Sequence, residues 1–109
     1  MAIMKAWKIR NEEARNLLGG ISSDRYAAME QVALHEELPE EVMIRISYVI
    51  RIFQVLHTVF GNSLADTWMS RPNSNSMFGG ATPLAYCLQH GTVGLKNVLR
   101  LLRALSEGY

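Results

Sequence analysis

The chain has 109 residues, of which 49% are hydrophobic and 19% are charged, and its formal net charge at pH 7 is +1. This composition excludes a disordered chain, and the length allows one compact domain with a modest core. The near-neutral charge excludes a strongly basic nucleic-acid binder, and the single cysteine excludes an internal disulfide. No secretory signal precedes the first charged residues, so we expect a soluble cytoplasmic protein.

Two short helices joined by a glycine turn are predicted near the amino terminus. The first is capped by Asn11, carries two glutamates in its first turn and ends at Gly19-Gly20. The second runs from about Ser23 to Val32, behind capping residues at positions 22–24. This outline is that of a helix-turn-helix, although two purely structural helices would give the same pattern.

An acidic connector, residues 33–38, leads to the longest predicted helix, Pro39–Phe60. Apolar residues cover two of its faces, so we expect it to be the central helix of the fold and the chain to form homo-oligomers. Arg45 and Arg51 interrupt the apolar run, which argues against a membrane span. The second apolar stripe comprises Met43, Ile44, Tyr48, Ile52, Val55 and Val59.

A further helix, capped by Ser63 or Asn62, should run through Trp68 and Met69. The next 13 residues, Ser70–Thr82, have no regular pattern, and loops of this length in small domains are often functional. Trp68 is expected to pack beneath this loop. A turn at residues 71–73 and the pair Gly79-Gly80 shape it, because glycine permits positive φ or close approach of another chain.

Thr82-Pro83 starts another helix, with threonine as the cap and proline at the first helical position. It should end near His90-Gly91, and Thr92 should cap the last helix, which runs to Glu107. Without any strand pattern, the sequence predicts an all-α fold of about six helices. We divide it into a helix-turn-helix-like segment, 1–38, and a long helix with a C-terminal helical domain, 39–109.

Cys87 and His90 lie three residues apart on a predicted helix and are the one candidate for catalysis. No orienting carboxylate stands near them in sequence, and a buried structural cysteine is the simpler interpretation. Three scattered histidines with one cysteine give no metal-ligand spacing. We therefore expect no catalytic residue, no metal and no cofactor, with a small Cys87–His90 enzyme as an alternative.

An ordered set of residues occupies the last half of the chain. It comprises Ala65, Trp68-Met69, Pro72-Asn73, Phe78-Gly79-Gly80, Thr82-Pro83-Leu84, Gly94-Leu95, Val98, Leu102 and Glu107-Gly108-Tyr109. This set resembles the toxin-binding domain of Xre/MbcA/ParS-type antitoxins. The upstream pair of helices and the segment Arg45-Ile46-Ser47 are also similar to shorter members of that family.

The resemblance implies an antitoxin of a type II toxin–antitoxin system. Its partner would be a RES-domain toxin that degrades NAD or transfers ADP-ribose, and binding would cover the toxin's NAD pocket in a hetero-oligomer. Trp68 and Leu84 would support the docking loop. The toxin-binding residues implied by the resemblance are Arg71, Pro72, Asn73, Phe78, Gly79, Gly80, Arg100, Arg103, Gly108 and Tyr109.

The resemblance also implies that the protein represses its own operon by binding operator DNA. The residues placed for this role are Arg15, Ser22, Ser23, Arg25 and Tyr26. Residues 26–41 hold five acidic and no basic side chains, so phosphate contacts would depend on the few basic groups before them. A stand-alone helix-turn-helix repressor is the alternative function.

Overall fold

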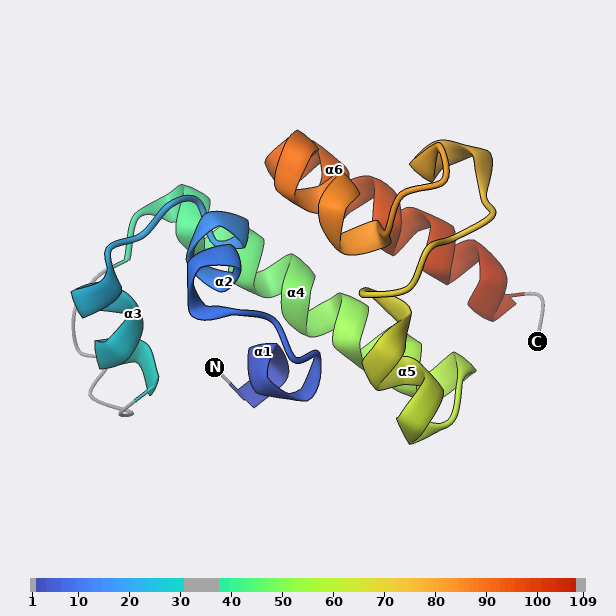
Figure 1. The fold of residues 1–109 in the computed structure, drawn as a ribbon, viewed down its shortest axis with the longest axis horizontal. Helices are drawn as coiled ribbons and strands as arrows, with labels where there is room; N and C mark the ends of the chain where they lie inside the picture. Colours follow the sequence, from blue (N-terminus) through green and yellow to red (C-terminus); the bar gives the residue numbers. More distant parts are fainter. Residues whose placement is uncertain (1, 31–37, 108–109) are drawn as a thin grey trace.

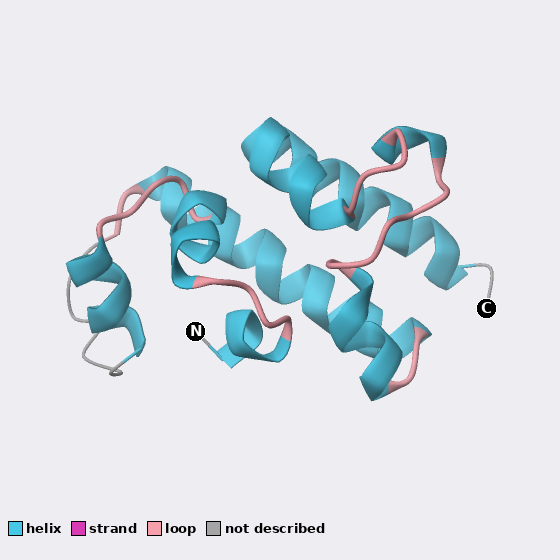
Figure 2. Ribbon diagram, in the orientation of Figure 1, coloured by secondary structure: helices cyan, strands magenta, loops and turns pink. Residues whose placement is uncertain are grey.

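A computed structural model of the chain describes residues 2–30 and 38–107. Throughout these ranges the regular structure is helical, as Figures 1 and 2 show, so the predicted all-α fold with about six helices is confirmed. The elements are α1 (Ala2–Ala6), α2 (Asn11–Leu17), α3 (Ser23–Glu30), α4 (Glu40–Val59), α5 (Asn62–Trp68), the short 3₁₀-helix η1 (Ser76–Phe78) and α6 (Pro83–Glu107).

Helix α4 runs through the middle of the fold, as the sequence predicts (Figure 1). Helices α6, α5 and α1 all pack against it, and α2 packs against α6. Val49, Ile52 and Leu56 are completely buried along its inner face. Because α4 contacts elements on both sides of position 38, the two predicted segments share one hydrophobic core.

The second apolar face of α4 is covered only in part. Ile52 is buried and Val55 is half-buried, but Met43 and Ile44 near the start of the helix are 52% and 37% exposed. Ile50 is also exposed. This surface is what led us to expect a homo-oligomer, which stays a prediction.

By length and composition alone, α4 is apolar enough to cross a membrane. The fold offers a different reason for its composition, because α1, α5 and α6 bury one side of the helix as a core helix. Arg45 lies near the start of α4, where its guanidinium donates hydrogen bonds to Glu41 and to the carbonyl oxygen of Leu17. These contacts are those of a helix packed within a protein.

Helix α1 is not predicted from the sequence, because its charged residues interrupt a short apolar pattern. Burial of two side chains explains why it forms. Met4 within the helix and Trp7 just after it are each 1% exposed. The ring of Trp7 lies 6.4 Å from that of Phe53 on α4, between centroids. Burial against α4 therefore stabilises a helix too short to form alone.

The predicted end of a helix at His90-Gly91 is confirmed inside α6. Gly91 has φ 62° and ψ −135°, values that only glycine adopts readily, so the chain turns sharply there. Gly94 then lies against the preceding turn: a Cβ on it would be 2.9 Å from the Cβ of His90 and 3.2 Å from the Cα of Cys87. The two parts of α6 can pack this closely only because Gly94 has no side chain.

Two predicted caps are confirmed by hydrogen bonds. The Ser22 hydroxyl accepts one from the backbone N–H of Arg25, at 3.1 Å, at the start of α3. The Thr82 hydroxyl accepts one from the N–H of Ala85, at 3.0 Å, at the start of α6. The predicted end of α3 at Val32 and nearly all of the acidic connector lie outside the described residues.

Two other predicted caps are wrong. Asn11 and Asn62 are the first residues of α2 and α5, and neither helix has a side-chain cap. The Asn62 amide oxygen instead lies 3.0 Å from Nδ1 of His57, whose Nε2 is 2.9 Å from a carboxylate oxygen of Asp66. His57 therefore joins α4 to α5. Its contact with Asn62 occupies the side chain that the sequence predicts as a helix cap.

Candidate functional site

The loop between α5 and α6 rests on a stack of three aromatic rings. Phe78 is buried between Trp68 and Tyr86, with ring centroids 6.1 Å and 5.4 Å away. Both pairs meet edge to face, at 80° and 88°, which is the geometry that aromatic quadrupoles favour. The Tyr86 hydroxyl in turn accepts a hydrogen bond from Asn97 at 3.0 Å, so the stack is tied to the second part of α6.

Backbone hydrogen bonds close the base of this loop. The N–H of Leu84 donates to the carbonyl of Met69 at 2.9 Å, and the N–H of Asn73 donates to the carbonyl of Ala81 at 3.3 Å. The Asn73 side chain accepts from the N–H of Asn75 at 2.9 Å. These bonds fix the path of a segment that contains little regular structure.

The expectation that residues 70–82 lack regular structure is wrong at one place, the 3₁₀-helix η1. The amide oxygen of Asn75 accepts from the N–H of Met77 at 2.9 Å and caps this turn. Gly79 ends it with φ 57°, and Gly80 follows with φ 87°. A Cβ on either glycine would have nothing within 4 Å, so both face open space.

The predicted docking residues separate into two groups. Arg71, Pro72 and the glycine pair are exposed on the loop, whereas Phe78 is buried beneath it and shapes the surface from below. Trp68 and Leu84, expected as supports, are buried. Gly108 and Tyr109 lie outside the described residues.

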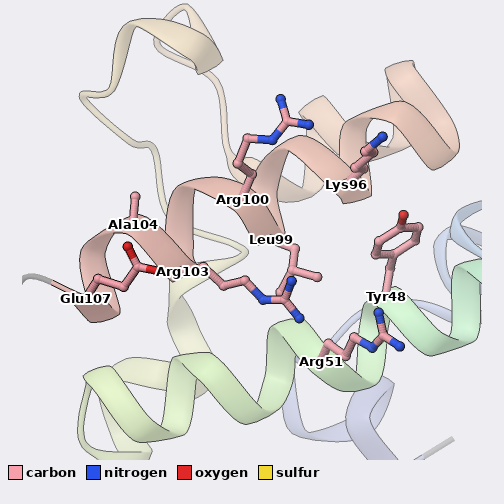
Figure 3. A pocket seen from close by; sticks show the side chains of 8 residues that line it. All are labelled: Tyr48, Arg51, Lys96, Leu99, Arg100, Arg103, Ala104 and Glu107. Atoms are coloured by element: carbon pink, nitrogen blue, oxygen red, sulfur yellow. The ribbon is translucent and has the colours of Figure 1, made fainter.

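Arg100 and Arg103 lie in a groove between α6 and α4, shown in Figure 3. Its volume is about 460 Å³. Arg51 reaches into it from α4 and Lys96 from α6, so four cationic side chains share one hollow. Within the described part of the chain none of the four makes an ion pair. The remaining lining residues are Tyr48, Leu99, Ala104 and Glu107.

The sequence predicts only the part of this cluster that lies on α6. The spacing of Lys96, Arg100 and Arg103, four and three residues apart, places them on one helix face and is visible in the sequence. Tyr48 and Arg51 lie some 50 residues earlier, in the predicted central helix, and the sequence assigns neither of them to a site. Only the packing of α4 against α6 brings them to the same groove.

A polar cluster joins the bend in α6 to α4. The Glu41 carboxylate accepts hydrogen bonds from the Thr92 hydroxyl and from Nε of Arg45, the latter at 3.1 Å. The Arg45 guanidinium also donates to the carbonyl of Leu17, at 3.4 Å, and lies over Gly91. Thr92, predicted as a helix cap, thus contributes its hydroxyl to a tertiary contact.

These contacts predict a measurable dependence of stability on pH. The hydrogen bond from Thr92, and then that from Arg45, hold the pKa of Glu41 below its ordinary value of 4.5. A lowered pKa stabilises the fold above the ordinary value, and this contribution disappears as the pH falls through the lowered one. We expect Glu41→Gln to be less stable than wild type at pH 6, with a difference that shrinks towards pH 3. Urea unfolding of both proteins across this range measures it, and a constant difference would contradict the assignment.

The five residues placed for DNA binding line two different hollows. Arg15, Ser23 and Tyr26 line a hollow of about 380 Å³ between α2 and α3. Ser22 and Arg25 line a different one of about 430 Å³. Tyr26 is buried, and the Ser22 hydroxyl caps α3, so two of the five have places in the fold itself.

The Cys87–His90 pair lacks the properties of a catalytic site. The Cys87 side chain is fully buried, and burial raises the pKa of its thiol to about 12. The thiolate, which is the nucleophilic form, is therefore scarce near neutral pH. His90 lies exposed on the surface, with its ring 4.5 Å from that of Tyr86. Cys87 thus has the environment of a structural cysteine.

Comparison with known proteins gives one match. Residues 55–108 match the family model of the antitoxin Xre/MbcA/ParS C-terminal toxin-binding domain. The matched range contains the loop on its aromatic stack, the exposed glycine pair and the whole of the second part of α6 that the structure describes. No curated protein and no solved structure matches the chain.

Proposed function

Since the chain belongs, through residues 55–108, to the Xre/MbcA/ParS family of antitoxin toxin-binding domains, we propose that it neutralises a RES-domain toxin of a type II system. The partner would consume NAD or transfer ADP-ribose, and direct docking of the antitoxin would cover its NAD pocket. The complex would form in the cytoplasm as a hetero-oligomer.

The observation that carries this proposal is a loop held rigid inside the matched range while its tip remains open. Phe78, fixed between Trp68 and Tyr86, sets the shape of residues 70–82 before any partner arrives. A preorganised surface loses less conformational freedom on binding than a mobile one. The glycines at positions 79 and 80 then let another polypeptide approach the backbone directly.

Occlusion also fits the chemistry of the chain, because an inhibitor that acts by covering a pocket needs no reactive group. The exposed residues beside the glycine pair are Arg71 and Pro72. Arginine is enriched among the residues that dominate binding energy, and proline keeps the backbone in one conformation. The docking surface can therefore act through its rigid shape and the charge of Arg71 alone.

Operator binding as a second activity has weaker support from the geometry. Arg15 and Arg25, the two cations placed for it, are half-buried and line different hollows. Glu12 lies in the first hollow and Glu41 in the second, so each arginine shares its hollow with a carboxylate that repels phosphate. Toxin binding is thus the function that we argue further.

We test the proposal by adding a side chain at the open tip of the loop. Gly80→Asn should keep the fold, since asparagine tolerates positive φ better than other residues and nothing lies within 4 Å. It should weaken binding to the product of the neighbouring gene, which in this proposal is the RES-domain toxin, by at least about tenfold, because the added group meets the partner. Calorimetric titration measures this, and growth on co-expression measures protection.

Gly20→Asn is the matched control. Gly20 has φ 80°, close to the 87° of Gly80, and its Cβ position is equally open, but it lies at the other end of the fold beside α2. The control variant should bind and protect like wild type. A neighbouring RES-domain protein that forms no complex with the wild-type chain would refute the proposed function.

A further inference from the structure

The groove between α4 and α6 carries four cationic side chains, none of which forms an ion pair within residues 2–30 and 38–107. Arg51, Lys96, Arg100 and Arg103 are all exposed at its walls, and Figure 3 shows Arg103 of α6 extending toward Arg51 of α4. Glu107 is the only carboxylate among the lining residues. Four like charges along one groove repel one another, so the arrangement is more favourable when an acidic group enters.

The basic groove continues into a second hollow along α4, which is apolar at Met43 and Ile44 and carries Glu40 at its far end. Tyr48 and Arg51 line both the basic groove and a neighbouring hollow of about 340 Å³. The neighbouring hollow is formed by the first turns of α4, including Met43 and Ile44, whose apolar side chains are exposed. The two hollows together offer an apolar end and a cationic end, joined at Tyr48.

We propose that this continuous surface binds an acidic segment of the toxin, with carboxylates on the four cations and an apolar side chain over Met43 and Ile44. The proposal rests on the proposed function and extends it in one respect. Tyr48 and Arg51 precede residue 55, where the family match begins. The long helix is therefore part of the docking surface and does more than hold the C-terminal domain.

Two other occupants fit the surface less well. A second copy of the chain, packed with this groove on a twofold axis, would bring the same four cations face to face, which costs energy. DNA would match the cations through its phosphates but would leave Met43 and Ile44 against a charged backbone, with no apolar partner. A protein segment with both acidic and apolar side chains satisfies both ends.

The test reverses the charge at Arg51 in the full-length chain. The probe is the RES-domain protein encoded by the neighbouring gene, titrated at several salt concentrations. Arg51→Glu should weaken binding by at least about tenfold at low salt and reduce the salt dependence of the affinity. Arg100→Glu, on the opposite wall, should do the same. Lys5→Glu makes the same charge change at an exposed side chain of α1, and this variant should bind like wild type.

Each outcome bears on the proposal. Thermal melting identifies any variant that has lost its fold. If Arg51→Glu is unfolded, Arg51→Gln, which removes the charge without reversing it, takes its place. Binding of wild type and unchanged binding by both reversed variants would overturn this inference while leaving the proposed function intact. Loss of dimerisation or of operator binding at Arg51→Glu, with toxin binding unchanged, would assign the groove to a second copy or to DNA. No binding by wild type would refute the proposed function itself.

Discussion

Trp68→Ala is expected to lower the free energy of unfolding by about 3–5 kcal/mol and to abolish toxin binding. The indole is buried, and its edge-to-face contact at 6.1 Å holds Phe78 under the loop. Without it the stack loses one side, and residues 70–82 lose the shape that we propose the toxin recognises. Urea unfolding measures the first effect, and calorimetric titration with the neighbouring RES-domain protein measures the second.

Trp7→Ala separates the two effects. Trp7 is also a buried tryptophan, 1% exposed, but it packs on Phe53 at the α1 side of α4. Its loss should cost a similar amount of stability and weaken toxin binding much less than Trp68→Ala at a temperature where both variants are folded, because Trp7 meets the loop only at its first residues, Ser70 and Arg71. Equal loss of binding in the two variants would mean that the loop's aromatic stack has no special part in recognition.

Gly94→Val is expected to destabilise the fold by about 1–3 kcal/mol or more, through overpacking. Even the first carbon of a side chain would lie 2.9 Å from the Cβ of His90 and 3.2 Å from the backbone at Cys87, and neither neighbour can rotate away. The two parts of α6 must then separate. Because the second part carries Arg100 and Arg103, toxin binding should weaken as well.

Gly61→Val is the control for this prediction. Gly61 has φ −66°, which valine adopts readily, and nothing lies within 4 Å of its Cβ position. Its melting temperature should stay within a few degrees of wild type. If Gly94→Val melts no lower than Gly61→Val, the close packing of the two parts of α6 is not as the structure has it.

The parts of the fold that the sequence predicts well are those with local causes. The glycines at 19, 20 and 91 have positive φ, and Thr82 with Pro83 starts α6 through a cap that needs only neighbouring residues. Helix α1 is not predicted because the contact that stabilises it is distant in sequence. Trp7 packs against Phe53, 46 positions later in the chain.

The candidate site divides in the same way. The sequence alone predicts a loop at the glycine pair and the Arg-Pro-Asn turn, because glycine permits positive φ and proline fixes φ. The burial of Phe78, by contrast, depends on where Tyr86 lies, and the basic groove depends on the contact between α4 and α6. No pattern within either helix indicates that Arg51 and Arg103 share a hollow.

The matched region begins at Val55, inside α4 and well after its first residue, Glu40. The matched range therefore does not coincide with a complete set of helices. A fragment cut at Val55 would sever a continuous helix and remove Val49 and Ile52, which are fully buried in the intact chain. A shortened chain that keeps this helix whole must therefore begin before Glu40.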